Sequence, residues 1–385
     1  MNSRSFVFFI KCRCGVLILQ LISVYVLPNH RSEDAFRLDY NNSVITPLAF
    51  FKGFNYWDAQ HFLQVAEHGY KEEFSLAFFP GFPMLARTIA TLFNSAPNIQ
   101  LITFLLNLIL SALCVLLLDS SSLHPKFMTG NENLTPFLFS INPATIFFTA
   151  SYSESLYFLI TLAILWSINR TWITYASILC FLSGFVRSNA MGSWFTFTKR
   201  TDKFIESLVL ICDSSNDSGV PSICYKRLMF LPYVYVELKY WNVGMPFAYW
   251  SFRQLPNFLI ALPTIAYAVY TLIFTIRQIR IMISKKKLLS SMLLLSHGFH
   301  LLFLVSFAVV FIHVQDMTRF LFSSSPLLYY YANYQINKTN KRTTEHFTSL
   351  NHIYYHIKQC DPVLSYFYLY FLMGTLLFSC GVPWT

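Results

Sequence analysis

The sequence predicts an all-α protein that crosses the membrane several times, and its composition and patterning support this. Of its 385 residues, 55% are hydrophobic and only 12% are charged, against about 25% charged residues in an average soluble domain. Several apolar runs approach or reach the roughly 20 residues that a helix needs to span a bilayer. Basic residues gather in short stretches beside these runs, as at Lys285–Lys287, which is typical of cytoplasmic loops. The net charge of +10 is therefore not read as a nucleic-acid-binding surface.

The first expected helix covers residues 1–27 and acts as an uncleaved signal anchor. Its apolar part follows Lys11 and Arg13, whose long side chains we expect to reach the membrane surface. The chain then runs Val26-Leu-Pro-Asn29, without the small residues of a signal-peptidase site. With the N-terminus in the cytosol, residues 28–98 form a large first loop on the lumenal side.

Residues 99–385 form the expected multi-helix transmembrane region. Its clearest span covers residues 99–118, which contain one Asn and no charge. Further apolar runs lie at residues 137–150, 155–168, 173–186, 258–276, 288–312, 320–334 and 363–380. The first two form a shorter pair, which is broken by Asn142-Pro143 and by Ser151-Tyr-Ser-Glu-Ser155. The run at 320–334 is short and partly polar, so a re-entrant segment is an alternative to a span there.

The order of these spans places four polar stretches on the lumenal side, at residues 28–98, 151–155, about 191–256 and 313–319. The basic stretch at residues 277–287 returns to the cytosol, in agreement with its charge. Of the five Asn-x-Ser/Thr sequons, only those at Asn41 and Asn216 are then expected to be open to glycosylation.

The first loop carries the residues that we expect to perform chemistry. Trp57-Asp-Ala-Gln-His-Phe62 contains no Gly or Pro and is predicted to be helical, which puts Asp58 and His61 on one face. A carboxylate beside an imidazole suits general-base catalysis, and the alternative is that Asp58 only caps the helix. Gly69 is the expected C-cap of this helix.

The next motif, Phe78-Phe-Pro-Gly-Phe-Pro83, is not expected to be regular helix. Its two prolines lack an amide donor, and its glycine permits a sharp turn. The motif is interpreted as an aromatic anchor at the membrane surface, as the rim where a lipid tail enters, or as both.

Arg187 and Arg319 lie at the ends of apolar runs on the predicted lumenal side. The planar guanidinium group binds phosphate bidentately, and a lipid-phosphate substrate would need such a ligand. The alternative is that both side chains reach out to the membrane surface. The sequence contains no Gly-rich phosphate loop, no HExxH and no cysteines at metal-ligand spacing, so no cofactor is expected and no metal ligands are assigned, while a metal requirement stays open.

Taken in order, several motifs resemble the signatures of the GPI mannosyltransferase 2 (PIG-V) family. The matching segments are Trp57–Phe62, Ala66–Tyr70, Ala77–Pro83, Tyr152–Ser155, Arg187–Asn189, Tyr240–Gly244, Pro256–Leu259, His313–Phe320 and Pro383–Thr385. The resemblance implies a multi-pass enzyme of the endoplasmic reticulum with the GT-C glycosyltransferase architecture. It also implies transfer of the second mannose, in α-1,6 linkage, from dolichyl-phosphate-mannose to a GPI-anchor precursor.

The resemblance implies that Asp58 is the catalytic carboxylate, because GT-C enzymes carry this group in the first lumenal loop. An inverting transfer needs only one base, whereas glycosidases use a second carboxyl group as an acid. His61 is the expected catalytic companion of Asp58. The residues expected to bind substrate are Trp57, Glu67, His68, Arg187, Asn189, Trp241, Asn242, Gln315 and Arg319. The expected partners are the donor, the GPI precursor glycolipid and membrane lipids, with a small accessory membrane subunit as a further candidate.

One region departs from the family pattern, because only residues 190–239 separate two motifs that the family keeps further apart. Leu208–Ile211 is too short to span a membrane. Two other functions are weighed against the main one. The first is another GT-C mannosyltransferase with the same donor, and the second is a lipid or solute transporter, which would favour inverted repeats that this sequence lacks.

Overall fold

The computed structural model describes residues 3–28, 50–71, 73–93, 98–120, 133–187, 247, 250–286, 288–311, 314–339, 361–382 and 384. Within these ranges the chain is helical and contains no β-strand. Four helical segments of this part are long and apolar enough to cross a membrane, namely Arg4–Val26, Ile99–Asp119, Phe252–Ser284 and Pro362–Ser379. The prediction of an all-α polytopic membrane protein is therefore confirmed.

The longest helices are α1 (Ser3–Val26), α5 (Ile99–Asp119), α7 (Glu154–Asn169), α12 (Leu255–Ser284), α13 (Leu288–Phe311) and α17 (Pro362–Ser379). The shorter α-helices are α3 (Asp58–His68), α4 (Gly81–Leu92), α6 (Thr135–Ser140), α8 (Ile173–Ser183), α14 (Met317–Phe322) and α15 (Leu327–Thr339). Short 3-10 turns complete the described elements: η1 (Lys52–Phe54), η2 (Glu73–Ala77), η3 (Thr145–Phe148), η8 (Phe252–Gln254) and η9 (Val314–Asp316).

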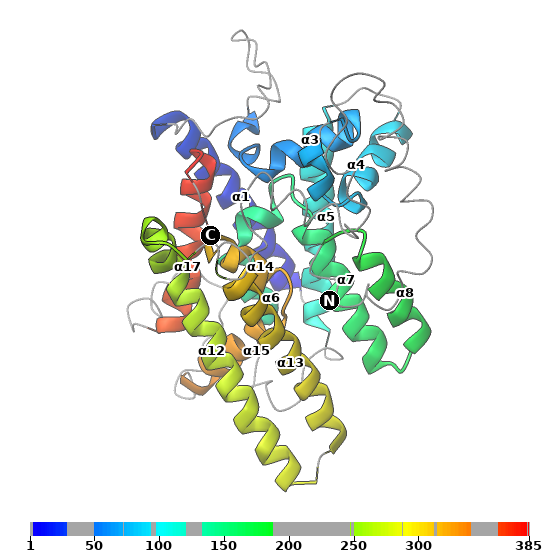
Figure 1. Ribbon diagram of the computed structural model, residues 1–385, viewed down its shortest axis with the longest axis vertical. Coiled ribbons are helices and arrows are strands. Elements are labelled where there is room, and N and C mark those ends of the chain that lie inside the picture. The colour runs from blue at the N-terminus through cyan, green and yellow to red at the C-terminus, as the bar shows by residue number, and fades with distance from the viewer. Residues whose placement is uncertain are drawn as a thin grey trace.

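The helices are arranged around α6, which packs against α1, α5 and α15. In Figure 1, α3 and α4 cover one end of the molecule, while α12 and α13 extend side by side toward the other end. The turn that joins α12 to α13 therefore lies far from the first loop. This agrees with the predicted orientation, in which the basic stretch and the first loop face opposite sides of the membrane. The division into residues 1–27, 28–98 and 99–385 stays a prediction, although α1 ends at Val26 and α5 begins at Ile99.

The predicted irregular motif Phe78–Pro83 is only partly irregular, because α4 begins at Gly81. Pro83 is tolerated there, since the amides of the first helical turn have no helical acceptor. The Gly81 amide donates to the Phe185 carbonyl at 2.8 Å, and a Cβ atom at Gly81 would lie 2.8 Å from that oxygen. Glycine thus allows α4 to dock on the segment that leads to Arg187.

The apolar run at residues 137–150 is not one continuous helix, and the predicted break at Asn142-Pro143 is confirmed. Helix α6 ends at Ser140, and the chain turns through Asn142 and Pro143 before η3. Asn142 closes the turn, because its Nδ2 donates to the Phe139 carbonyl at 2.6 Å and its Oδ1 accepts from the Ala144 amide at 2.8 Å. A residue that precedes proline is biased away from helical geometry, which explains the break. The buried turn looks apolar because protein surrounds it, and not because lipid does.

The run at residues 320–334 is also not one continuous helix. Helix α14 ends at Phe322 and α15 begins at Leu327, with Ser323–Pro326 between them. Each helix is shorter than the roughly 20 residues of a continuous spanning helix, so a span and a re-entrant segment both stay predictions for this run.

Arg13 does not reach the membrane surface, so the expectation for this side chain is wrong. It is 3% exposed, and its Nη1 donates to the Thr145 carbonyl at 3.1 Å, to Thr145 Oγ1 at 2.8 Å and to Thr149 Oγ1 at 2.7 Å. These three oxygens accept hydrogen bonds from the buried guanidinium group, as water or lipid headgroups would at the membrane surface. Arg13 thereby ties α1 to η3.

Candidate active site

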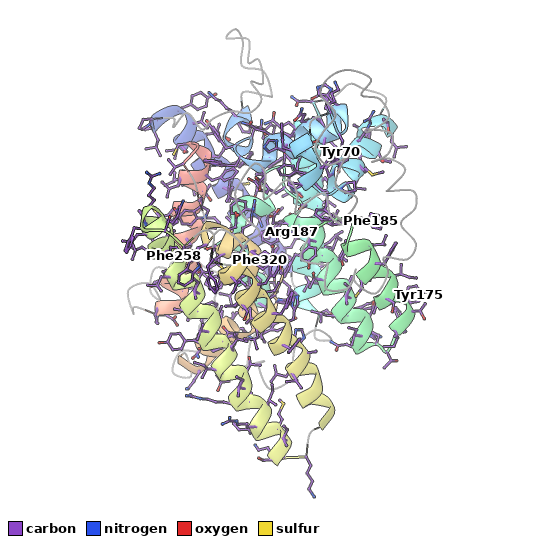
Figure 2. The ribbon with its side chains drawn as sticks, in the orientation of Figure 1. Tyr70, Tyr175, Phe185, Arg187, Phe258 and Phe320 are labelled. Atoms are coloured by element: carbon purple, nitrogen blue, oxygen red, sulfur yellow. The ribbon has the colours of Figure 1, made fainter. Side chains whose placement is uncertain are left out.

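Five charged side chains, one from the first loop and four from later segments, lie close together, and we call them the charged cluster. They are Asp58 at the start of α3, Glu154 at the start of α7, Arg187 after α8, Asp316 in η9 and Arg319 in α14. Figure 2 shows Arg187 beside Phe320, the neighbour of Arg319, in the middle of the molecule. Three of the polar stretches predicted to be lumenal thus contribute to one site.

Arg319 is the centre of the cluster, because each of its three nitrogens faces a different carboxylate. Its Nη1 lies 2.5 Å from Asp58 Oδ2, and its Nη2 lies 2.9 Å from Asp316 Oδ1. Its Nε lies 3.6 Å from Glu154 Oε1. The guanidinium carbon also lies 5.4 Å and 5.5 Å from the ring centroids of Phe147 and Tyr152, within the range of cation–π attraction.

Arg187 reaches the same cluster from the other side. Its Nη2 lies 3.1 Å from Glu154 Oε1, and its Nη1 donates to Ser323 Oγ at 2.5 Å. One oxygen of Glu154 therefore contacts both arginines. The proposal that these arginines reach out to the membrane surface is wrong for both, because buried carboxylates hold them inside the protein.

The five side chains differ in exposure, so the cluster has a partly exposed rim and a buried floor. Asp58 is 35% exposed and Asp316 is 28% exposed, whereas Arg319 and Arg187 are 15% and 12% exposed and Glu154 is 2% exposed. A substrate that approaches from solvent would therefore meet the two aspartates first and the arginines next.

Asp58 does not cap its helix, so the alternative role considered for it is wrong. Trp57 is the N-cap residue, and no side chain makes a capping hydrogen bond there. Asp58 accepts instead from Arg319. Burial alone would raise the pKa of the Asp58 carboxyl, but the charge and hydrogen bond of Arg319 outweigh it, so this pKa lies below its ordinary value. Asp58 is thus ionised at neutral pH.

His61 follows Asp58 by about one turn of α3 and is held by aromatic rings. Its ring stacks on Phe78 with centroids 4.6 Å apart and meets the edge of Phe74 at 5.3 Å. Burial lowers the pKa of His61, and the nearby charge of Asp58 offsets this only in part. His61 is therefore neutral at pH 7, and it contributes no positive charge that would add to that of the arginines.

The other predicted site residues are only partly brought together. Trp57 adjoins Asp58 as the N-cap of α3, and Gly69 is the C-cap with φ 77°, as predicted. Glu67 and His68 lie exposed at the far end of α3, about 14 Å along the helix from Asp58 at 1.5 Å per residue. Gln315 belongs to η9, and its side chain lies outside the described part of the chain. Asn189, Trp241 and Asn242 also lie outside the described residues.

Sequence reasoning did not assign Glu154 or Asp316 to the site. A signal existed for Glu154, because an ionisable residue at the start of an apolar helix is costly and usually functional. A signal for Asp316 was its position three residues before Arg319, where two helical side chains share a face. Among the described residues, no group of three or more His, Cys, Asp or Glu side chains is arranged to hold a metal ion.

Known proteins that resemble this chain are GPI mannosyltransferases. It is 26% identical to "GPI alpha-1,6-mannosyltransferase 2" of Mus musculus, over 98% of this chain and 97% of that protein. It is 25% identical to the Homo sapiens protein of the same name, over 98% of this chain and 97% of that protein. "GPI mannosyltransferase 2" of Drosophila melanogaster is 24% identical over 97% of both chains. No solved structure matches the chain.

The alignment with the Mus musculus protein covers 482 positions, more than the 385 residues of this chain. That relative therefore has interior residues that this chain lacks, in agreement with the short stretch noted at residues 190–239. The sequence pattern of the mannosyltransferase (PIG-V) family matches in two parts, residues 4–210 and 207–385, and the two parts meet within the same stretch. Together these parts cover nearly all of the chain, which belongs to the mannosyltransferase (PIG-V) family.

Proposed function

We propose that this chain adds the second mannose, in α-1,6 linkage, to a GPI-anchor precursor in the endoplasmic reticulum membrane, with dolichyl-phosphate-mannose as donor. Its family and the names of its relatives support this function over a transporter. The observation that carries the proposal is the meeting of Asp58 with Arg319 and Arg187, which lie far apart in the sequence. The site combines a carboxylate, Asp58, that is the most exposed of the cluster with two cationic groups.

Asp58 is the proposed base. It accepts the proton of the acceptor hydroxyl while the oxygen of that hydroxyl attacks C1 of mannose. The bond between C1 and the phosphate oxygen breaks, and its electron pair leaves with dolichyl phosphate. Because phosphate is a weakly basic leaving group, no acid is needed to protonate it. The β-linked donor gives an α-linked product through this single inversion.

Arg319 is the proposed ligand of the donor phosphate, and Arg187 is its neighbour on the same carboxylate. Cationic donors held at the phosphate stabilise the charge that develops there as the C1–O bond breaks. Glu154 keeps both guanidinium groups in place before the substrate arrives, because its Oε1 contacts both. Such preorganisation lowers the cost of arranging charges during the reaction.

The function is tested by expressing the chain in cells that lack the second GPI mannosyltransferase. Wild-type chain should restore GPI-anchored proteins at the cell surface, and the one-mannose precursor that accumulates should gain a second mannose. Chain carrying Asp58→Asn should restore neither. Failure of the wild-type chain to add mannose, when it is present at the level of a functional relative, would contradict the proposal.

A further inference from the structure

We propose that Arg319 holds Asp58 in an ion pair while the donor site is empty, and that the donor phosphate takes the place of Asp58 on Arg319 and releases it to act as base. This inference rests on the proposed function. It starts from one juxtaposition: the guanidinium expected to bind phosphate is already bound by the carboxylate expected to be the base.

While Asp58 is paired with Arg319, it is unsuited to act as the catalytic base. Asp58 Oδ2 accepts a hydrogen bond from Arg319 Nη1 at 2.5 Å, so this oxygen is occupied. The charge of Arg319 also keeps the pKa of Asp58 below its ordinary value, and a carboxylate with a lowered pKa accepts a proton poorly. The observed arrangement is therefore a resting state of the base.

Of the three carboxylates that face Arg319, Asp58 is the one that can be replaced. Glu154 is buried and also holds Arg187, so its departure would break an ion pair of each arginine at once. Asp316 lies three residues before Arg319 on the same segment, so it moves together with the arginine. Asp58 comes from a different element, α3, and is the most exposed of the three.

The charge of the cluster favours exchange over simple addition. Three carboxylates face two guanidinium groups in the resting site. A phosphodiester carries one negative charge, as Asp58 does, and both accept charge-assisted hydrogen bonds from arginine. Replacement of one by the other leaves three anions in contact with Arg319, whereas a phosphate added to the intact cluster would be a fourth. The base then becomes free only when the donor is in place.

The exchange is tested by donor binding to purified full-length chain in detergent, with dolichyl-phosphate-mannose of shortened isoprenoid length as the probe. Asp58→Asn removes the competitor for Arg319, so the dissociation constant of the probe should fall by at least about tenfold while mannose transfer is lost. Asp58→Ser serves the same purpose if the asparagine variant does not fold. Asp119 is the last residue of α5 and lies outside the charged cluster. Asp119→Asn makes the same chemical change there and should leave donor binding unchanged.

Asp316→Asn separates exchange from a general effect of charge. It removes one negative charge beside Arg319 but leaves Asp58 in place, so it should tighten binding clearly less than Asp58→Asn. Equal tightening by both variants would overturn the exchange in favour of net charge. Unchanged or weaker binding by Asp58→Asn, with transfer lost, would also overturn it but leave Asp58 as the base. Absence of probe binding to the wild type and to both variants would contradict the proposed donor itself.

Discussion

Arg13 and Arg319 are both buried arginines that contact the segment around η3, yet their partners differ in kind. Arg13 donates to a carbonyl and two hydroxyls of Thr145 and Thr149, and in the described part of the chain no carboxylate pairs with it. Arg319 faces three carboxylates and packs beside Phe147, which belongs to η3. Arg13 therefore retains an unneutralised positive charge, whereas the charge of Arg319 is more than balanced.

The difference indicates two roles for the same side chain. The neutral partners of Arg13 are buried, so no substrate can replace them, and the contacts hold α1 and η3 together. The carboxylates around Arg319 extend to the rim of the site, and an anion can replace one of them. A buried arginine thus supports structure or binds substrate according to whether its partners are fixed or exchangeable. The predictions below test this distinction.

Asp58→Asn should have the largest effect, because it removes the proposed base but keeps size and most hydrogen bonds. Mannose transfer in microsomes should fall by at least about 100-fold, while the amount of protein stays close to wild type. Asp119→Asn is the matched control and should retain full transfer. Near-normal transfer by Asp58→Asn would show that this carboxylate is not the base.

Arg319→Lys should have the next largest effect, because lysine keeps the charge but loses the planar fork. If Arg319 binds the donor phosphate, the apparent affinity for the donor should weaken by about 1.5–3 kcal/mol, the range for a hydrogen bond to a charged group. The measurement is the dependence of transfer on donor concentration in microsomes. An unchanged dependence would exclude Arg319 as the phosphate ligand and point to Arg187.

Arg13→Met should weaken the fold without changing recognition of the donor. The change leaves the Thr145 and Thr149 oxygens without their charged donor, and the expected loss of stability is about 1–3 kcal/mol, partly offset by removal of a buried charge. The amount of protein and its unfolding temperature in detergent should fall, while the donor KM of the remaining enzyme stays at the wild-type value. A raised donor KM would mean that Arg13 also acts on the site.

The sequence predicted the parts of this molecule that depend on local patterns. The apolar length of residues 99–118 is a property of that stretch alone, and α5 follows it closely. The helix that begins at Asp58 and its Gly69 cap also follow from neighbouring residues. Asp58 and Arg319 were singled out because an acid or an arginine beside a membrane span is costly.

The parts that could not be predicted depend on contacts between distant residues. Asp58 and Arg319 are separated by 261 positions, and Arg13 and Thr145 by 132. No single-sequence pattern specifies such pairs, so Arg13 was expected at the membrane surface. The sequence of the run at residues 137–150 does not reveal that protein surrounds it, because protein-facing and lipid-facing apolar residues have the same composition. Glu154 was not assigned because its role depends on two arginines that only the fold brings to it.

Glycosylation should have the smallest effect on activity, yet it tests which end of the molecule faces the lumen. The predicted topology places the first loop, and therefore Asp58, on the lumenal side, so Asn41 should carry a glycan. Asn133 and Asn337 should stay bare, and their side chains donate instead to the carbonyls of Leu118 and Asn333 at 3.0 Å and 2.9 Å. Endoglycosidase treatment should shift the mobility of the wild type, and among single Asn→Gln variants of Asn41, Asn133 and Asn337 only Asn41→Gln should reduce that shift. Transfer by Asn41→Gln should equal that of the wild type, whereas a glycan on Asn337 would overturn the orientation of the C-terminal third.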